Sequence, residues 1–120
     1  MKKKTILTLT ILTTLLASCT NDSEADLVDV PNENTVTYTN YVKNVIDSNC
    51  LFCHGATPSN GAPMSLTTYS LVKDAVLNRG LLDRISRPQG SSGMMPNGGT
   101  RLPQTTIDAI TKWQTDGLLE

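Results

Sequence analysis

The sequence predicts an all-α fold. Apolar residues recur at three- and four-residue spacing in three separate segments, which is the period of one helix face. No segment alternates apolar and polar residues as a half-buried strand does. Glycine and proline gather between the periodic segments, where they favour loops. The 120 residues suffice for one compact domain, and its core is expected to be modest because only 4% of them are aromatic.

The first predicted helix runs from Tyr38 to Asn49. Its apolar positions form a single stripe made of Tyr38, Tyr41, Val42, Val45 and Ile46. The helix leads directly into Cys50. The segment 55–63, which contains two glycines and two prolines, is expected to be a loop.

Two further helices are predicted, with a long loop before the last one. The first runs from about Thr68 to Asn78 and stops at Gly80. Its inward residues are expected to be Leu71, Val72, Ala75 and Val76. Residues 81–86 add a short helical turn, and the Gly- and Pro-rich segment 88–103 forms an extended loop of the kind that often carries function. The last helix spans about 105–116 and ends at Gly117, with an inward face made of Ile107, Ile110 and Trp113.

The first 18 residues have the features of an export signal. Lys2, Lys3 and Lys4 precede an apolar stretch of about 11 residues, which is too short to span a bilayer, since spanning takes about 20. The stretch ends in Leu16-Ala17-Ser18-Cys19, which resembles the bacterial lipobox, where cleavage exposes a cysteine that receives a diacylglyceryl group. We therefore expect a lipoprotein signal peptide over 1–18 and lipidation of Cys19. An ordinary signal peptide, with Cys19 in this place by chance, is the alternative.

The segment 19–36 is acidic and poor in apolar residues. Its charged side chains are Asp22, Glu24, Asp26, Asp29 and Glu33. Such a composition is typical of a flexible tether. Removal of the three N-terminal lysines with the signal leaves acidic residues in excess and no basic patch for nucleic acid. The folded domain is expected to span 37–120.

Residues 50–54 read CLFCH, which is the CxxCH pattern of c-type haem attachment. Two thiols three positions apart at a helix end can add to the two vinyl groups of one haem, and the adjacent His54 is then placed to coordinate the iron. His54 is the only histidine of the chain. Such attachment takes place outside the cytoplasm, so motif and export signal agree. The sequence predicts one covalent haem c at Cys50 and Cys53, with His54 as an axial iron ligand.

Two other interpretations of the motif have less support. A redox-active CxxC of the thioredoxin type needs a βαβ pattern around it, and no strand pattern is present. A closed zinc site needs four ligands, usually cysteine and histidine, and the domain offers only three.

The second axial ligand must be of another residue type, because the chain has no other histidine. Methionine is the alternative. Met64 lies ten residues after His54 and is expected to fill the core. Met94 and Met95 lie in the long Gly-rich loop, with enough intervening chain to reach the opposite haem face.

The run Gly93-Met94-Met95-Pro96 belongs to a wider pattern, which continues with Leu102, Ile107, Ile110, Trp113 and Gly117. This pattern resembles the C-terminal half of class I cytochromes c. The resemblance covers about 38–117 and implies the cytochrome c fold, with three to four helices wrapped around one haem. It also implies that Met95 is the distal ligand, with Met94 as a neighbour on the porphyrin edge.

The resemblance further implies that the terminal helices cross. Val42 and Ile46 should then pack on Ile110 and Trp113. The crossing should be less close than in relatives that have glycine where this chain has Val42, and Gln114 stands where an aliphatic residue is common.

Two polar contacts are also implied. A proline carbonyl, that of Pro63 or less well that of Pro58, should accept a hydrogen bond from the axial histidine and orient its ring. One of Arg84, Arg87 and Arg101 should pair with a haem propionate, and ordinary surface ion pairs are the alternative for each.

A haem with two protein ligands stores and passes one electron, so we expect a carrier and not an enzyme. The expected carrier is a monomer, exported and held by its lipid on the periplasmic side or at the outer membrane of a bacterium. It meets redox donor and acceptor proteins transiently and binds no nucleic acid. The alternatives are an open-site haem protein for small gases or peroxide, and a haem subunit of a larger redox enzyme.

Overall fold

The computed structural model describes residues 35–120. The predicted signal peptide, the lipidation site Cys19 and the acidic segment up to residue 34 lie outside the described residues. Within them the chain is helical and contains no strand, which confirms the all-α class. The helices in chain order are η2 (Tyr38–Val42), α1 (Lys43–Asn49), α2 (Leu51–His54), α3 (Tyr69–Asn78), α4 (Leu81–Ser86) and α5 (Gln104–Thr115). No helix in this part of the chain is long and apolar enough to cross a membrane.

The helices η2, α1 and α2 follow one another directly and carry the chain from Tyr38 to His54. The stretch begins at Thr37, whose hydroxyl accepts the Asn40 N–H while the Asn40 side chain accepts the Thr37 N–H. This reciprocal pairing satisfies two backbone donors that a helix start would leave open. The bounds agree with the predicted helix over 38–49. The first turn is a π-helix, which the apolar period alone does not distinguish.

Helix α3 starts at Thr68, whose hydroxyl accepts the Leu71 N–H at 3.3 Å. Three of the four predicted inward residues are buried: Val72, Ala75 and Val76. The fourth prediction is wrong, because Leu71 is 39% exposed. Leu71 lies one position, about 100° around the helix, from Val72, so it lies at the edge of the buried stripe.

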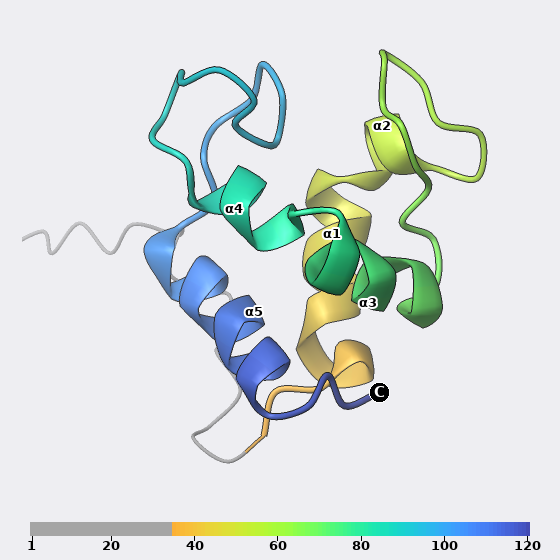
Figure 1. The fold of residues 1–120 in the computed structure, drawn as a ribbon, viewed down its shortest axis with the longest axis vertical. Coiled ribbons are helices and arrows are strands. Elements are labelled where there is room, and N and C mark those ends of the chain that lie inside the picture. The colour runs from red at the N-terminus through yellow and green to blue at the C-terminus, as the bar shows by residue number, and fades with distance from the viewer. Residues whose placement is uncertain (1–34) are drawn as a thin grey trace, which may run out of the picture.

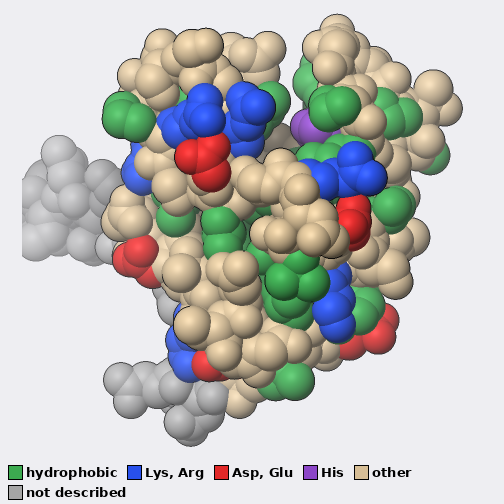
Figure 2. Space-filling model, in the orientation of Figure 1, with side chains coloured by type: hydrophobic (Ala, Val, Ile, Leu, Met, Phe, Trp, Pro, Cys, Tyr) green, Lys and Arg blue, Asp and Glu red, His purple; other side chains and the backbone are tan. Residues whose placement is uncertain are grey.

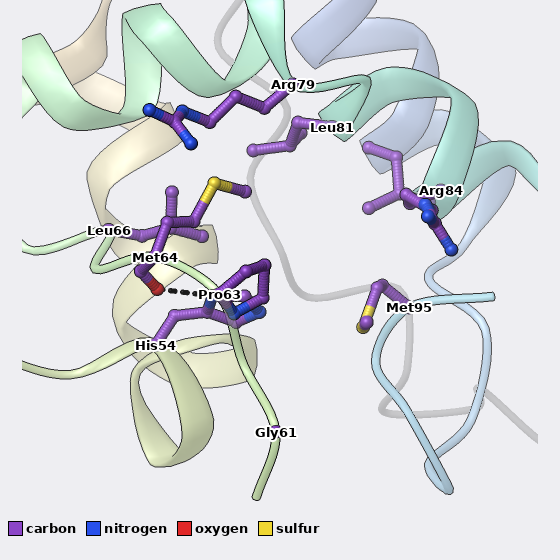
Figure 3. A pocket seen from close by; sticks show the side chains of 10 residues that line it. His54, Gly61, Pro63, Met64, Leu66, Arg79, Leu81, Arg84 and Met95 are labelled. Carbon is purple, nitrogen blue, oxygen red and sulfur yellow. Dashed lines mark hydrogen bonds between the residues drawn. The ribbon is translucent and has the colours of Figure 1, made fainter. Parts of the chain in front are cut away.

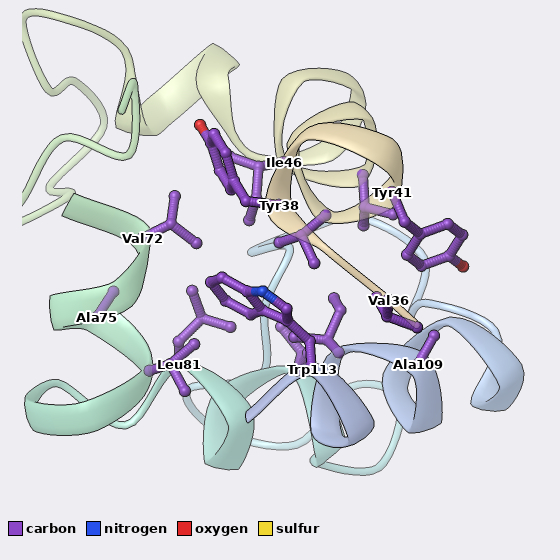
Figure 4. Close-up of a cluster of buried hydrophobic side chains, with 14 of the residues drawn as sticks. Val36, Tyr38, Tyr41, Ile46, Val72, Ala75, Leu81, Ala109 and Trp113 are labelled. Carbon is purple, nitrogen blue, oxygen red and sulfur yellow. The ribbon is translucent and has the colours of Figure 1, made fainter. Parts of the chain in front are cut away.

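The core is built around Trp113, which is fully buried on α5 (Figure 4). Val42, Ile46 and Ile110 belong to the same cluster, so both terminal helices contribute to one core. The Tyr41 hydroxyl, on η2, also donates a hydrogen bond to Thr106 Oγ1 on α5 at 3.4 Å. The aromatic rings of Tyr38, Tyr69 and Trp113 pack with centroids 5.5 to 6.4 Å apart.

The C-terminal tail closes this core by its backbone carbonyls. Leu119 O accepts hydrogen bonds from Trp113 Nε1 at 2.6 Å and from the Tyr38 N–H at 2.8 Å. Leu118 O accepts the Tyr69 hydroxyl at 2.6 Å. The tail therefore joins η2, α3 and α5 at one end of the domain.

Replacement of Tyr69 by phenylalanine should lower the free energy of unfolding by about 1 kcal/mol, because the Leu118 carbonyl loses its donor while the ring packing stays. Chemical denaturation of the full chain measures the change. Tyr41→Phe is the matched control, since it removes only the longer 3.4 Å bond to Thr106. A smaller loss for Tyr69→Phe than for Tyr41→Phe would contradict the role of the tail.

The two long loops, 55–68 and 87–103, lie at the other end of the domain (Figure 1). Residue 35 and the C-terminus lie opposite them (Figure 1). Helix α2 lies at the loop end, so the fold brings the CLFCH segment and the Met-containing loop to one end of the molecule.

Candidate functional site

A cleft opens between the two loops, with the histidine at its floor and cationic side chains on both sides (Figure 2). Two cavities make up the cleft, of about 320 and 290 Å³. His54, Gly61 and Met95 line both of them, so the cavities adjoin. Each volume is near the lower bound for ligand pockets, and together they lie well within that range.

Helix α2 places the two cysteines and the histidine on one side of the cleft. The His54 N–H donates to Cys50 O at 2.9 Å, a regular helical bond, so positions 50, 53 and 54 share a face. All three residues line the second cavity. Both thiols are free. A single helical turn therefore brings Cys50, Cys53 and His54 close together at the cavity.

Cys50 packs against the hydrophobic core, and this burial raises the pKa of its thiol from 9.0 to about 11. The thiolate of Cys50 is correspondingly scarce near neutral pH. Reactive cysteines of redox CxxC motifs have the opposite property, a lowered pKa. Cys50 therefore lacks the acidified thiol that is typical of redox CxxC motifs.

The His54 ring is oriented by a backbone carbonyl. Its Nδ1 lies 2.8 Å from Met64 O, and because a carbonyl only accepts, Nδ1 carries the proton (Figure 3). The other nitrogen, Nε2, then holds a free lone pair in the neutral ring. No hydrogen bond is made by Nε2. Among the described residues every fully buried side-chain nitrogen or oxygen has a hydrogen-bond partner, so Nε2 is not fully buried. Because His54 lines both cavities, Nε2 is accessible from the cleft.

This carbonyl belongs to Met64 and not to Pro63 or Pro58, which corrects the residue expected from the family resemblance. Pro63 lines the first cavity instead. The carbonyl that reaches the histidine ring is therefore one residue further along the loop than expected. Two residues after Met64, the Leu66 N–H donates to His54 O at 2.8 Å and so ties this part of the loop to α2.

Met95 lies across the first cavity from His54 (Figure 3). It is partly buried and packs on the core. Met94 is 4% exposed and lines neither of the two cavities. Met64 lines the first cavity, but its backbone holds His54, so it belongs to the histidine side.

The three arginines proposed for the propionates are placed differently from one another. Arg84 lines the first cavity. Arg87 pairs with Asp83 at 2.7 Å, and Arg101 donates to the carbonyls of Ser86 and Arg87. Neither Arg87 nor Arg101 lines the two cavities.

Arg79 is a cavity residue that the sequence interpretation missed. It follows α3 and pairs with Asp74 at 2.6 Å. Its only sequence signal is a position beside Gly80, which is not specific. Apolar side chains complete the walls of the first cavity, namely those of Leu66, Leu81 and Ile85.

Comparisons with protein-family models, with curated proteins and with solved structures each found no match. Within residues 35–120, no three side chains of His, Cys, Asp or Glu come together in a group that could hold a metal ion by themselves.

Proposed function

We propose that this chain is an electron-transfer carrier of the cytochrome c fold, with one covalently bound haem c. The observation that carries the proposal is the position of His54 and Met95 on opposite sides of one cavity, with Cys50 and Cys53 beside the histidine. Imidazole and thioether are the axial ligand pair of electron-transferring c-type haems.

The residues of the cleft fit this group. The bond from His54 Nδ1 to Met64 O leaves Nε2 as the nitrogen through which the neutral imidazole would bind iron. Cys50 and Cys53 offer free thiols on the same side as that nitrogen. The walls contributed by Leu66, Leu81 and Ile85 are apolar, as a porphyrin face requires.

The group itself supplies a one-electron ferric–ferrous couple. His54 and Met95 would hold the iron of such a group, and the Met64 carbonyl keeps the His54 ring in one orientation. With Met95 and His54 both bound to the iron, no coordination position would be left for a substrate. This arrangement favours a carrier over an enzyme. Arg79 and Arg84 offer positive charge to the haem carboxylates at the cavity wall.

The partners in this proposal are a redox donor and a redox acceptor that bind transiently. Phe52, between the two cysteines, is 88% exposed at the second cavity and offers them an apolar contact. The chain is proposed to be an exported monomer, held on a bacterial membrane through lipid on Cys19. It contacts no nucleic acid.

The proposal is tested on the full-length chain, produced in a host with haem-attachment machinery. The intact mass under denaturing conditions should exceed the apoprotein mass by one haem. The reduced form should show the sharp bands of a low-spin haem, and the oxidised form the weak far-red band of thioether-to-iron charge transfer.

The possible outcomes separate the alternatives. A mass without haem would overturn the proposal and return Cys50 and Cys53 to thiol chemistry. Covalent haem without the far-red band, together with rapid CO binding, would identify an open-site haem protein instead.

A further inference from the structure

The loop that carries Met95 has no helix between Ser86 and Gln104, so its backbone groups need other partners. Part of the loop bonds to itself: the Ser91 N–H donates to Pro88 O at 3.1 Å, and the Met94 N–H to Ser91 O at 3.2 Å. These short-range turns leave other backbone groups of the loop without partners inside it. Several of those groups are bonded by residues at the end of helix α4.

Two arginines at the end of α4 bind the carbonyls just before the methionine pair. Arg87 Nη1 donates to Ser92 O at 2.7 Å, and Arg84 Nη1 donates to Gly93 O at 3.2 Å. The backbone carbonyl of Arg84 also accepts the Met95 N–H at 3.1 Å. Helix α4 thus holds residues 92–95 by both side chains and backbone.

Gly93 makes this approach possible. Its φ is +73°, which favours glycine, and a Cβ there would overlap Arg84 Nη1 and lie 2.6 Å from Arg87 Nη1. The two guanidinium groups therefore occupy the space that any other residue would fill.

The arginines are themselves held in place. Arg87 is oriented by Asp83, whose carboxylate accepts Nε at 3.1 Å and Nη2 at 2.7 Å. Helix α4 is fixed to the core by Leu81 and Ile85, which are buried. The half-exposed ion pair with Asp83 contributes little stability by itself, so the bonds to loop carbonyls are the more consequential contacts.

We infer that Arg84 and Arg87 are positioning residues: they hold the 92–95 backbone so that the Met95 thioether faces His54 across the cavity. That Met95 is held in place to bind a haem iron rests on the proposed function, whereas the attachment of the loop to α4 does not. Loss of both arginines should free the loop and weaken the thioether–iron bond while the core stays folded.

The test compares the double variant Arg84→Met/Arg87→Met with the wild-type full-length chain. Amide hydrogen exchange at Met95 should accelerate about tenfold or more, the effect of losing hydrogen bonds from charged donors, while exchange at Ile110 in the core stays unchanged. The far-red band of the haem-loaded variant should weaken, and its ferrous form should bind CO faster.

Lys112→Met is the matched control. This substitution removes one cation and its i,i+4 ion pair with Asp116, which resembles the Arg87–Asp83 pair. Lys112 lies in the last turn of α5, at the end of that helix far from the Met95 loop. It should leave the Met95 exchange and the band as in the wild type. Gly93→Ala retains both arginines yet displaces their guanidinium groups, so it should reproduce the double variant.

Unchanged Met95 exchange in the double variant would overturn the inference. Faster exchange with an unaltered band and unaltered CO binding would overturn the positioning of Met95. Equal acceleration at Ile110 in both the double variant and Gly93→Ala would show a general loss of stability, and would overturn it as well. Failure of the proposed function is distinct, because the wild-type chain itself would then carry no haem mass.

Discussion

Replacement of Cys50 and Cys53 together by serine is expected to abolish covalent haem attachment completely. Serine preserves the size and polarity of the side chain but has no sulfur to form a thioether with a vinyl carbon. Both residues line the same cavity beside His54, so both are placed to bind one group. The intact mass under denaturing conditions should fall from the haem-loaded to the haem-free value.

The single variants provide the finer measurement. Cys50→Ser and Cys53→Ser should each keep one thioether and hence the haem mass, but with a shifted reduced absorption band, because one vinyl group stays conjugated with the porphyrin. Cys19→Ser is the control, since it removes the third cysteine of the chain and should leave haem attachment intact. Haem mass on the double variant would show that attachment lies elsewhere.

Met95→Ala is expected to convert a six-coordinate haem into an open one. The thioether that faces His54 across the cavity disappears (Figure 3), and the neighbouring Met94 lines neither cavity. The far-red band should vanish, and the ferrous form should bind CO rapidly. The reduction potential should fall, because a thioether ligand favours the ferrous state.

Met94→Ala is the adjacent control and should behave in the opposite way. Met94 is buried and lines neither cavity, so its truncation removes packing and not a ligand. The free energy of unfolding should fall by about 2–5 kcal/mol while the far-red band stays. Loss of the band in Met94→Ala, with retention in Met95→Ala, would reverse the assignment.

The helices could be predicted from the sequence because the signals for them lie within a few residues of each helix. The helix bounds over 38–49, 69–78 and 104–115 depend on apolar period and on caps such as Thr37 and Thr68, all within a few residues. Leu71 shows the limit of this reasoning, because it lies at the edge of a stripe whose width depends on what packs against it.

In the candidate site, too, local sequence signals predicted some residues and only the packing of the chain placed others. The sequence by itself determined that Cys50, Cys53 and His54 share one face, because one helical turn brings these positions together. It also predicted that the residue opposite His54 comes from the Gly-rich loop, where the resemblance to class I cytochromes c implied Met95 and not Met94. The covalent haem and the electron-carrier function remain predictions, for which the cleft supplies the matching donor set.

Only the tertiary structure decided which side chains of the loops face the cleft. A loop has no period that assigns neighbouring residues to faces, so local pattern could not distinguish Met94 from Met95; the structure places Met95 at the cleft, as the resemblance implied. Met64 O, not the carbonyl of Pro63, reaches His54, because the direction of a carbonyl depends on how the whole loop returns to α2. Arg79 and Arg84 line the cavity from either side of Gly80 because packing of α3 and α4 on the core carries them there, a result that no local sequence pattern contains.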